Sequence, residues 1–207
     1  MMNGNIIRGA LFDAVGTLIY ADPPVANVYA EAAEQHGVQV SLTEIEQRIA
    51  SAIEQHFAER TQSSEVIERD RWRAIVAEVF HDAPKAVDAI FSDLWTHFAS
   101  PSAWRLFDDV EACFAALREL GVRVGIASNF DARLKQVCAG HDVLSDVDVF
   151  CSSELGFAKP HVEFFRAIEQ RLQLPPSSLT MVGDDLVLDH QAAVAAGWRS
   201  IPLVRDG

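Results

Sequence analysis

The sequence predicts an α/β fold: a three-layer, Rossmann-like core with a mostly parallel sheet, plus an inserted all-helical domain. One observation is an apolar run that ends on Asp13 and is followed by a glycine turn, as a buried strand does at its carboxyl end. Another is the alternation of apolar runs with helical patterns after about Ser100, which is typical of a parallel sheet with helices on both faces. Between the two regions the sequence contains helical patterns alone.

That middle stretch predicts four consecutive helices, an arrangement typical of a bundle. Gly37 ends the first helix, and Ser41 with Glu44 has the spacing of a capping box at the start of the second. Apolar residues three and four apart mark the buried face of each helix. They are Val25, Val28, Tyr29, Ala32 and Ala33 in the first helix and Leu42, Ile45, Ile49, Ala52, Ile53 and Phe57 in the second. In the third they are Trp72, Ile75, Val76, Val79 and Phe80, and in the fourth Val87, Ile90, Phe91, Leu94, Trp95 and Phe98. We expect the aromatic members of the last two stripes, Trp72 and Trp95 included, in the bundle core rather than around a ligand.

The alternating region predicts the rest of the core. Its expected elements are, in order, a helix through Val110, Phe114 and Leu117 that ends at Gly121, a strand over 122–127, a helix after Asp131, a strand over 147–151, a helix over 161–172, a strand around Thr180 and a helix that ends at Gly197. The first strand belongs to the same sheet, so the bundle is an insertion. We therefore expect residues 1–19 and 101–207 to form the core and residues 20–100 the helical domain.

The composition excludes several classes of protein. The net charge of −13 argues against nucleic-acid binding, which depends on lysine and arginine to neutralise phosphates. The sequence has no apolar run of membrane-spanning length, and residues 1–5 lack the pattern of a signal peptide, so we expect a cytoplasmic protein that does not bind membranes. Cys113, Cys138 and Cys151 are odd in number and lie in apolar surroundings, which favours reduced core thiols. The oligomeric state is not predicted.

Carboxylates follow two of the predicted strands. Asp13 ends the first strand, and Asp184, Asp185 and Asp189 follow the strand around Thr180. Because ligands of open α/β sheets bind outside the carboxyl ends of the strands, the two clusters predict a divalent cation between them, with Mg²⁺ as the hard cation that prefers oxygen ligands. Either cluster alone would be explained as well by helix capping or turn formation.

Further polar residues complete an ordered set at the strand ends. The set is Asp13 and Thr17, then Ser128 and Asn129, then Lys159 and Pro160, then Gly183 and Asp184 with Asp189. It resembles the four motifs of the haloacid dehalogenase-like hydrolases: a nucleophilic aspartate, a serine or threonine, a lysine and an acidic pair. The resemblance covers residues 11–197. It implies a hydrolase, with the helical domain as a cap that closes over the site and selects the substrate.

Phosphoryl transfer assigns a role to each residue of the set. Asp13 would attack phosphorus and form an aspartyl-phosphate, and Lys159 would balance the charge of the nucleophile and the phosphate. The phosphoryl oxygens would be held by the Ser128 hydroxyl and the backbone N–H of Asn129. Thr17 would serve the same site or stabilise the turn. The resemblance further implies Asp13, Asp184 and the Val15 carbonyl as Mg²⁺ ligands, with Asp185 and Asp189 as acids that orient them.

Val15 is the departure from the family pattern. Phosphatases of this family usually carry a second aspartate there, as the acid and base for the leaving group and the water. General acid–base catalysis contributes about 10²–10⁴-fold, so a protein with Val15 should be slow on alkyl phosphates. The main hypothesis is a magnesium-dependent phosphatase of a small phosphorylated metabolite. The alternative is a catalytically impaired protein that binds a phosphometabolite or a partner.

A 2-haloacid dehalogenase is the third hypothesis, because these enzymes also lack the second aspartate. They usually have a tyrosine at the place of Val15, a cap arginine soon after it and no Gly-Asp metal motif. Here no arginine lies between Arg8 and Arg48, and Phe165 stands where they have a tyrosine. Because Gly183-Asp184 is intact, the sequence favours phosphate over halide.

Overall fold

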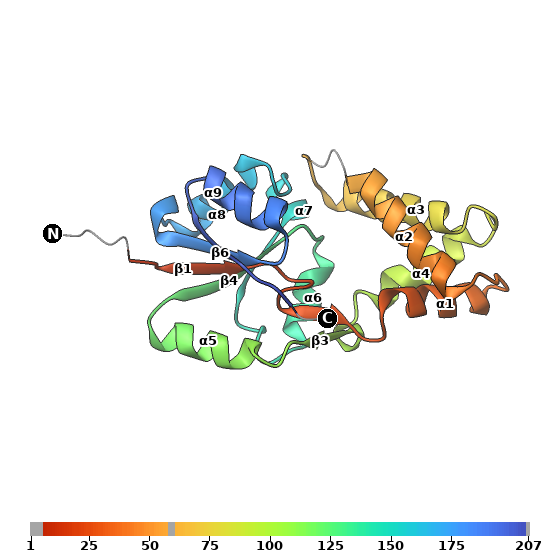
Figure 1. Ribbon diagram of the computed structural model, residues 1–207, viewed down its shortest axis with the longest axis horizontal. Coiled ribbons are helices and arrows are strands. Elements are labelled where there is room, and N and C mark those ends of the chain that lie inside the picture. Colours follow the sequence, from red (N-terminus) through yellow and green to blue (C-terminus); the bar gives the residue numbers. More distant parts are fainter. Residues whose placement is uncertain (1–5, 58–60, 206–207) are drawn as a thin grey trace.

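The computed structural model describes residues 6–57 and 61–205, and a five-stranded parallel sheet forms its centre (Figure 1). The strands are β1 (Gly9–Phe12), β4 (Arg123–Ser128), β5 (Asp148–Cys151), β6 (Leu179–Gly183) and β7 (Arg199–Pro202), in the spatial order β5-β4-β1-β6-β7. Strand β1 is buried along its whole length and pairs with β4 and β6, so that Phe12 lies between Ile126 and Val182. The predicted fold class is confirmed.

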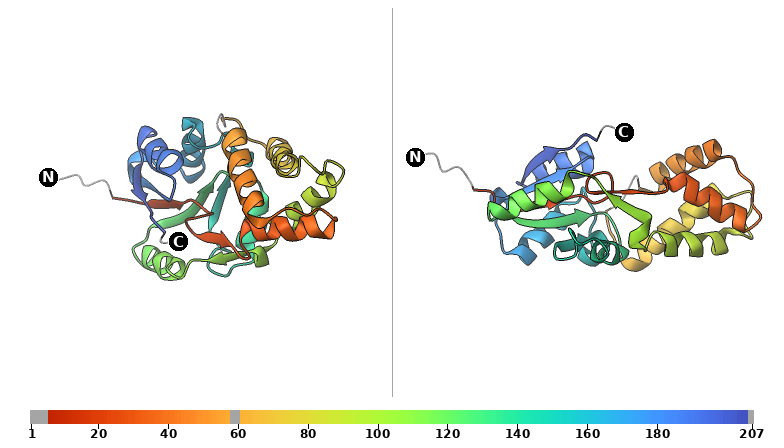
Figure 2. Two further views of the ribbon diagram at one scale, coloured as in Figure 1. Left: turned by 45° about the vertical axis from the view of Figure 1, so that its right-hand side comes forward. Right: turned by 90° about the horizontal axis from the view of Figure 1, so that it is seen from below.

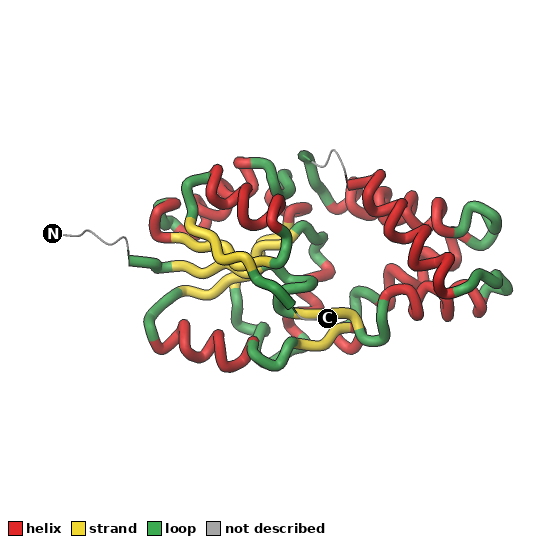
Figure 3. Tube along the Cα trace, in the orientation of Figure 1, coloured by secondary structure: helices red, strands yellow, loops and turns green. Residues whose placement is uncertain are grey.

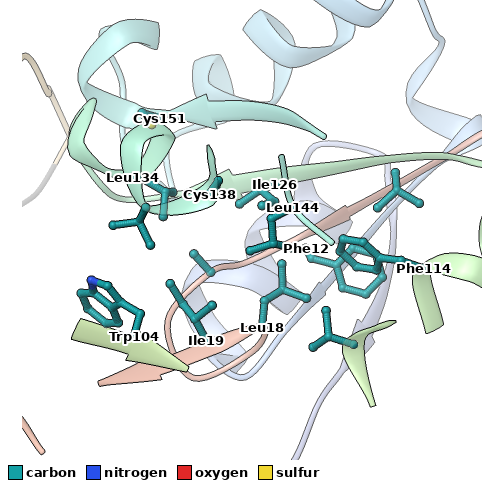
Figure 4. Packing of buried hydrophobic residues seen from close by; sticks show 14 of the residues in the cluster. Phe12, Leu18, Ile19, Trp104, Phe114, Ile126, Leu134, Cys138, Leu144 and Cys151 are labelled. Atoms are coloured by element: carbon teal, nitrogen blue, oxygen red, sulfur yellow. The ribbon is translucent and has the colours of Figure 1, made fainter. Parts of the chain in front are cut away.

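Helices cover both faces of the sheet. Helices α5 (Val110–Glu119) and α6 (Arg133–Ala139) lie on one side, and α8 (Val162–Leu172) and α9 (Ala192–Ala195) lie on the other (Figure 1). Because successive side chains of a strand point to opposite faces, β1 serves two apolar clusters. Phe12 packs towards α5, where its ring centroid lies 5.1 Å from that of Phe114 (Figure 4). Leu11 belongs to the cluster on the α8 side.

The four predicted helices of the insertion are present as α1 (Val25–Gln35), α2 (Leu42–Phe57), α3 (Glu65–Val79) and α4 (Val87–His97). They share an apolar cluster of their own and lie together beyond one end of the sheet (Figures 2 and 3). The carboxyl end of β1 points towards them. The expected stripe of α2 is partly wrong: Ile45 and Ala52 are buried as expected, but Leu42 and Ile53 are exposed.

Two short strands join the helical domain to the core. Strands β2 (Ile19–Ala21) and β3 (Trp104–Leu106) form an antiparallel ribbon that the sequence did not predict. Tyr20 and Ala21, which we assigned to the helical domain, pair here with Arg105 and Trp104. Three-residue strands of this kind carry too little alternation to be recognised from sequence.

The other differences are local. Strand β7 and helix α7 (Ser152–Leu155) were not predicted, and the 3₁₀ turns Pro101–Ala103 and Pro176–Ser178 precede β3 and β6. A π-helix over Leu186–Gln191 leads into α9 where we expected one continuous α-helix. A π-turn inside a helix often marks a functional site, because the extra residue changes the direction of a side chain.

All three cysteines are free, as expected for reduced thiols. Cys138 and Cys151 are buried, and burial raises the pKa of Cys138 to about 12. The expectation that Cys113 is also a core residue is wrong: it lies on the outer side of α5, beside the buried Phe114. Within residues 6–57 and 61–205, no helix has both the length and the apolar character needed to cross a membrane.

Candidate active site

Asp13 lies at the edge of the sheet where the carboxyl ends of β1, β4 and β6 meet. It directly follows β1, and its backbone N–H donates to the carbonyl of Val182 on β6 at 2.9 Å. Its side chain is 14% exposed. Asp13 therefore lies at the end of the central strand, as expected, and one side of its carboxylate is accessible to a ligand.

The turn after Asp13 closes around Asp184. Gly16 has a φ of +85°, a conformation that side chains rarely adopt, and a β-carbon on it would collide with the carboxylate of Asp184. The hydroxyl of Thr17, which is 1% exposed, donates to Oδ1 of Asp184 at 2.9 Å. The turn and the carboxyl end of β6 therefore hold one acidic group between them.

Lys159 connects two carboxylates in the interior. Its ammonium lies 2.7 Å from Oδ1 of Asp13 and 2.5 Å from Oδ1 of Asp189, and its side chain is 2% exposed. Burial alone would lower the pKa of Lys159, but the attraction of the two carboxylates outweighs it, so that the pKa is raised. Lys159 therefore stays charged and places positive charge directly against the predicted nucleophile.

Asn129 holds the backbone of Lys159. Its side-chain oxygen accepts from the Lys159 N–H at 2.7 Å, and its amide nitrogen donates to the Lys159 carbonyl at 2.9 Å. From the sequence, Asn129 was expected to act only through its backbone N–H; its side-chain role was not predicted, since a contact between residues 30 positions apart leaves no local pattern. Ser128, the last residue of β4, is buried beside it.

Asp189 and Asp185 take different positions. Asp189 is buried at 1% exposure and accepts from the N–H of Asp185 at 3.2 Å, and a β-carbon on Gly183 would collide with it. Burial raises the pKa of Asp189, although the charge of Lys159 opposes the shift. The Asp185 side chain caps the π-helix by accepting from the N–H groups of Val187 and Leu188 at 2.7 and 2.8 Å. Asp185 thus contacts Asp189 through its backbone N–H and caps the helix that carries Asp189.

The acidic groups fit a divalent cation. Asp13, Asp184 and Asp189 each offer a carboxylate oxygen, and the three oxygens lie within 4.8 Å of one another. A set made only of oxygens suits Mg²⁺. Among the described residues, no backbone hydrogen bond of the turn ends on the carbonyl of Val15, so this oxygen is available as a further ligand.

Arg205 supports the turn from behind and was missed by the sequence analysis. It donates to the carbonyl of Thr17 at 2.6 Å and pairs with Asp109 at 2.8 Å. The N–H of Leu203 donates to the carbonyl of Gly183 at 2.8 Å. The segment after β7 therefore stabilises both the Thr17 turn and the end of β6. An arginine near a chain end has no sequence pattern that would indicate this contact.

The chain belongs to the haloacid dehalogenase-like hydrolase family, whose model matches residues 7–197. Among its relatives, the human haloacid dehalogenase-like hydrolase domain-containing protein 3 is 30% identical over 217 residues, which cover 97% of this chain and 86% of that protein. The protein is thus a hydrolase of this family, and the predicted resemblance is confirmed.

Solved structures show the same fold. The magnesium-bound HAD hydrolase YfnB from Bacillus subtilis superimposes with a TM-score of 0.74 at 17% identity, over 94% of this chain and 87% of that one. The defluorinating L-2-haloacid dehalogenase Rha0230 gives a TM-score of 0.76 at 17% identity, over 94% of this chain and 80% of that one. Because proteins with different reactions share this fold, the reaction has to be argued from the site.

Proposed function

We propose that this hydrolase is a magnesium-dependent phosphomonoesterase that acts on a small phosphorylated metabolite through an aspartyl-phosphate on Asp13. The observation that carries the proposal is the contact of the Lys159 ammonium with Asp13, at 2.7 Å, beside the oxygens of Asp184 and Asp189. Phosphoryl transfer needs a positioned nucleophile with positive charge around the phosphoryl oxygens, and this edge of the sheet offers both.

The residues would act in two steps. An oxygen of Asp13 attacks phosphorus, the bond from phosphorus to the ester oxygen breaks, and the alkoxide takes a proton from water. A second water then attacks phosphorus, the bond to Asp13 breaks, and phosphate leaves. Lys159 holds one oxygen of Asp13 in place, while the Ser128 hydroxyl and the Asn129 N–H hold phosphoryl oxygens.

Asp13, Asp184 and the carbonyl of Val15 would hold Mg²⁺, with Asp189 as an orienting acid. Bound Mg²⁺ would supply positive charge to the phosphoryl oxygens. Thr17 keeps the carboxylate of Asp184 in one orientation through its hydroxyl, at 2.9 Å. We also propose that residues 1–19 and 101–207 act as the catalytic core and residues 20–100 as the cap, and that the protein works in the cytoplasm, where its three free thiols suit a reducing environment.

A second function is favoured by Val15, which is 40% exposed at the place of the usual acid. A protein without that acid could bind a phosphometabolite, or a partner, without turning a substrate over. Binding would then raise the melting temperature across a panel of phosphates with no release of phosphate. At a hundredfold excess of ligand over its dissociation constant, the stabilisation is about 2.7 kcal/mol. Robust turnover of one physiological phosphate would exclude this function.

A dehalogenase is the third candidate. The carboxylate oxygens of Asp13, Asp184 and Asp189 gather as for a cation, which halide displacement does not require. Release of chloride from 2-chloropropionate in the presence of a chelator would favour the dehalogenase. The phosphatase proposal expects no such release.

Turnover of p-nitrophenyl phosphate tests the main proposal. The ester has a good leaving group, so a site with Val15 should still hydrolyse it. We expect turnover that requires Mg²⁺ and is abolished in Asp13→Asn, with Asp142→Asn as the control for loss of an aspartate elsewhere on the core. Equal rates in wild type and Asp13→Asn, or turnover that persists with a chelator, would contradict the proposal.

A further inference from the structure

A cavity of about 80 Å³ lies between the helical domain and the core. Seven of its eleven lining residues are aromatic. Six of these are Tyr29 of α1, Trp72 of α3, Phe91 and Trp95 of α4, Trp104 of β3 and Phe130 of the core. We call this space the aromatic pocket. Apolar side chains normally pack against one another without unfilled space, so aromatic side chains gathered around a space of this size need an explanation.

The pocket adds to an expectation from the sequence. Trp72, Phe91 and Trp95 follow helical stripes and were expected in the bundle core, together with Phe80. Phe80 and Phe91 are buried there as expected, and Phe80 stacks on Tyr29 at 6.2 Å between centroids. Trp72 and Trp95 pack against the same core but are only partly buried, and with Phe91 they also line the pocket. A stripe that faces a cavity has the same spacing as one that faces a packed neighbour, which is why the sequence could not separate them.

The pocket adjoins the predicted phosphoryl-binding residues. Phe130, on its wall, directly follows Ser128 and Asn129, and consecutive Cα atoms are about 3.8 Å apart. The carbonyl of Phe130 is fixed by the hydroxyl of Ser152 at 3.3 Å, and its ring meets Trp104 edge-on at 6.2 Å. A phosphoryl group held by Asn129 would therefore have its ester oxygen within reach of this wall.

The wall of the pocket offers no free charge. Arg133 is the cation among the lining residues, and it makes two hydrogen bonds of 2.8 Å to the buried carboxylate of Asp131. The same guanidinium lies 3.4 Å from the ring centroid of Trp95 and donates to the Trp95 carbonyl at 3.2 Å. Arg133 thus closes the contact between α6 and α4 with its charge already neutralised.

These properties limit what the pocket can hold. A ligand with several hydroxyl groups would lose its hydrogen bonds to water and find few partners on aromatic walls, which costs free energy for each group. A hydrocarbon group loses no hydrogen bonds and gains from burial. A cavity of about 150 Å³ holds benzene, so this smaller pocket suits a short or branched alkyl chain.

We propose that the aromatic pocket binds the alcohol portion of the substrate, and that the substrate is a phosphomonoester of an alcohol with a short or branched hydrocarbon chain. The proposal rests on the proposed phosphatase function and adds the substrate class to it. The phosphoryl group would lie at Asp13, Ser128 and Asn129, and the chain would extend past Phe130 between Trp95 and Trp104.

The test compares two phosphates with the same skeleton, 2-methylbutyl phosphate and glycerol 3-phosphate, in which hydroxyl groups replace the two methyl groups. We expect the KM of wild type to be roughly tenfold lower for 2-methylbutyl phosphate, since a methyl group in an apolar pocket contributes a factor of this order. Val76→Phe on α3 fills the pocket and should remove this preference. Val66→Phe, at an exposed position on the same helix, should retain it.

A second variant, which enlarges the pocket, keeps the proposal testable if Val76→Phe does not fold. Trp72→Phe should keep the preference for alkyl over glycerol phosphate and should lower the KM for the bulkier 2-phenylethyl phosphate. Turnover of 2-methylbutyl phosphate and glycerol 3-phosphate with equal KM in wild type would overturn the pocket proposal and leave the phosphatase function standing. So would an unchanged preference in a folded Val76→Phe protein.

Binding without turnover separates the two proposals. Calorimetry on Asp13→Asn measures the affinity for each phosphate, with Mg²⁺ present, when no reaction can occur. If wild type hydrolyses neither these esters nor p-nitrophenyl phosphate, but Asp13→Asn binds 2-methylbutyl phosphate roughly tenfold more tightly than glycerol 3-phosphate, the pocket proposal is supported and the phosphatase function fails. Equal affinities for the two esters would overturn the pocket proposal whatever the turnover.

Discussion

The strand-end site and the aromatic pocket are neighbours that are built in opposite ways. At the strand ends, a buried ammonium is matched by two carboxylates, and Asp184 is held by Thr17. In the pocket, the cation among the lining residues, Arg133, is already paired with Asp131, and most of the wall consists of aromatic rings. A buried charge is stable only when an opposite charge lies in a fixed position beside it. An apolar wall makes non-directional contacts and can therefore accept different hydrocarbon groups. The comparison suggests that the core determines the reaction and the cap the size and polarity of the substrate.

Loss of Lys159 should have the largest effect on the strand-end site. Lys159→Met leaves Asp13 and Asp189 facing each other without their shared cation, so we expect turnover to be lost. The free energy of unfolding should fall by about 3–5 kcal/mol, the usual cost of removing one partner of a buried ion pair. Urea unfolding with a chelator and with Mg²⁺ measures this, and Mg²⁺ should restore part of the stability.

Lys135→Met is the matched control, because Lys135 pairs with Glu154 at the surface. Exposed pairs contribute about 0–1 kcal/mol, so this variant should unfold almost like wild type and keep its activity. A Lys159→Met protein as stable as the control in chelator would contradict our account of the buried charges.

Phe80→Ala tests whether the packed core of the helical bundle and the aromatic pocket are independent of each other. Phe80 is fully buried between the cap helices, and truncation of a buried phenylalanine costs about 3–5 kcal/mol. At a temperature where the variant is still folded, its preference for alkyl over glycerol phosphate should be unchanged. Thermal unfolding and the two KM values measure both effects. A lost preference would mean that the bundle core and the pocket are not separate.

Val15→Asp should change the reaction more than the stability. The position is 40% exposed, so a carboxylate there keeps much of its hydration. The new acid can protonate a poor leaving group, and we expect the ratio of alkyl to aryl phosphate turnover to rise about 100-fold. Val15→Asn has the same shape without the proton and should leave the ratio unchanged. An equal ratio in all three proteins would show that another group already supplies the proton.

Arg205→Ala should have the smallest effect. It removes hydrogen bonds to the carbonyl of Thr17 and to Asp109, worth about 1–2 kcal/mol together at this partly exposed position. Because Thr17 also holds Asp184, the affinity for Mg²⁺ should weaken several-fold. Asp109→Asn keeps the contact to Thr17 and should bind Mg²⁺ like wild type. Calorimetric titration with Mg²⁺ separates the two, and equal affinities in all three proteins would exclude a role for Arg205 in holding the turn.

The sequence predicted the sheet and the order of the site residues because each is a local pattern. Asp13, Gly16 and Thr17 follow one apolar run, and the parallel sheet then brings them to the residues after β4 and β6. The side chain of Asn129 and the contact of Arg205 were not predictable in this way, since both join residues far apart in the chain.

The aromatic pocket was not predictable for the same reason, because its lining residues are far apart in the chain. Its wall comes from three cap helices, β3 and the segment after β4, and each contributes one or two rings. No single stretch of sequence contains enough of the wall to be recognised. The prediction that Cys113 is buried was wrong for a related reason: apolar neighbours in the sequence do not show which side of a helix a residue occupies.

Trapping of the covalent intermediate tests the central claim most directly. Borohydride reduces an acyl phosphate to an alcohol, so an aspartyl-phosphate becomes homoserine, which peptide mass spectrometry locates in the chain. Our account predicts homoserine at position 13 when a phosphate ester and Mg²⁺ are both present, and none in Asp13→Asn or with chelator. Phosphate release without modification of Asp13, or modification of another carboxylate in its place, would contradict the account.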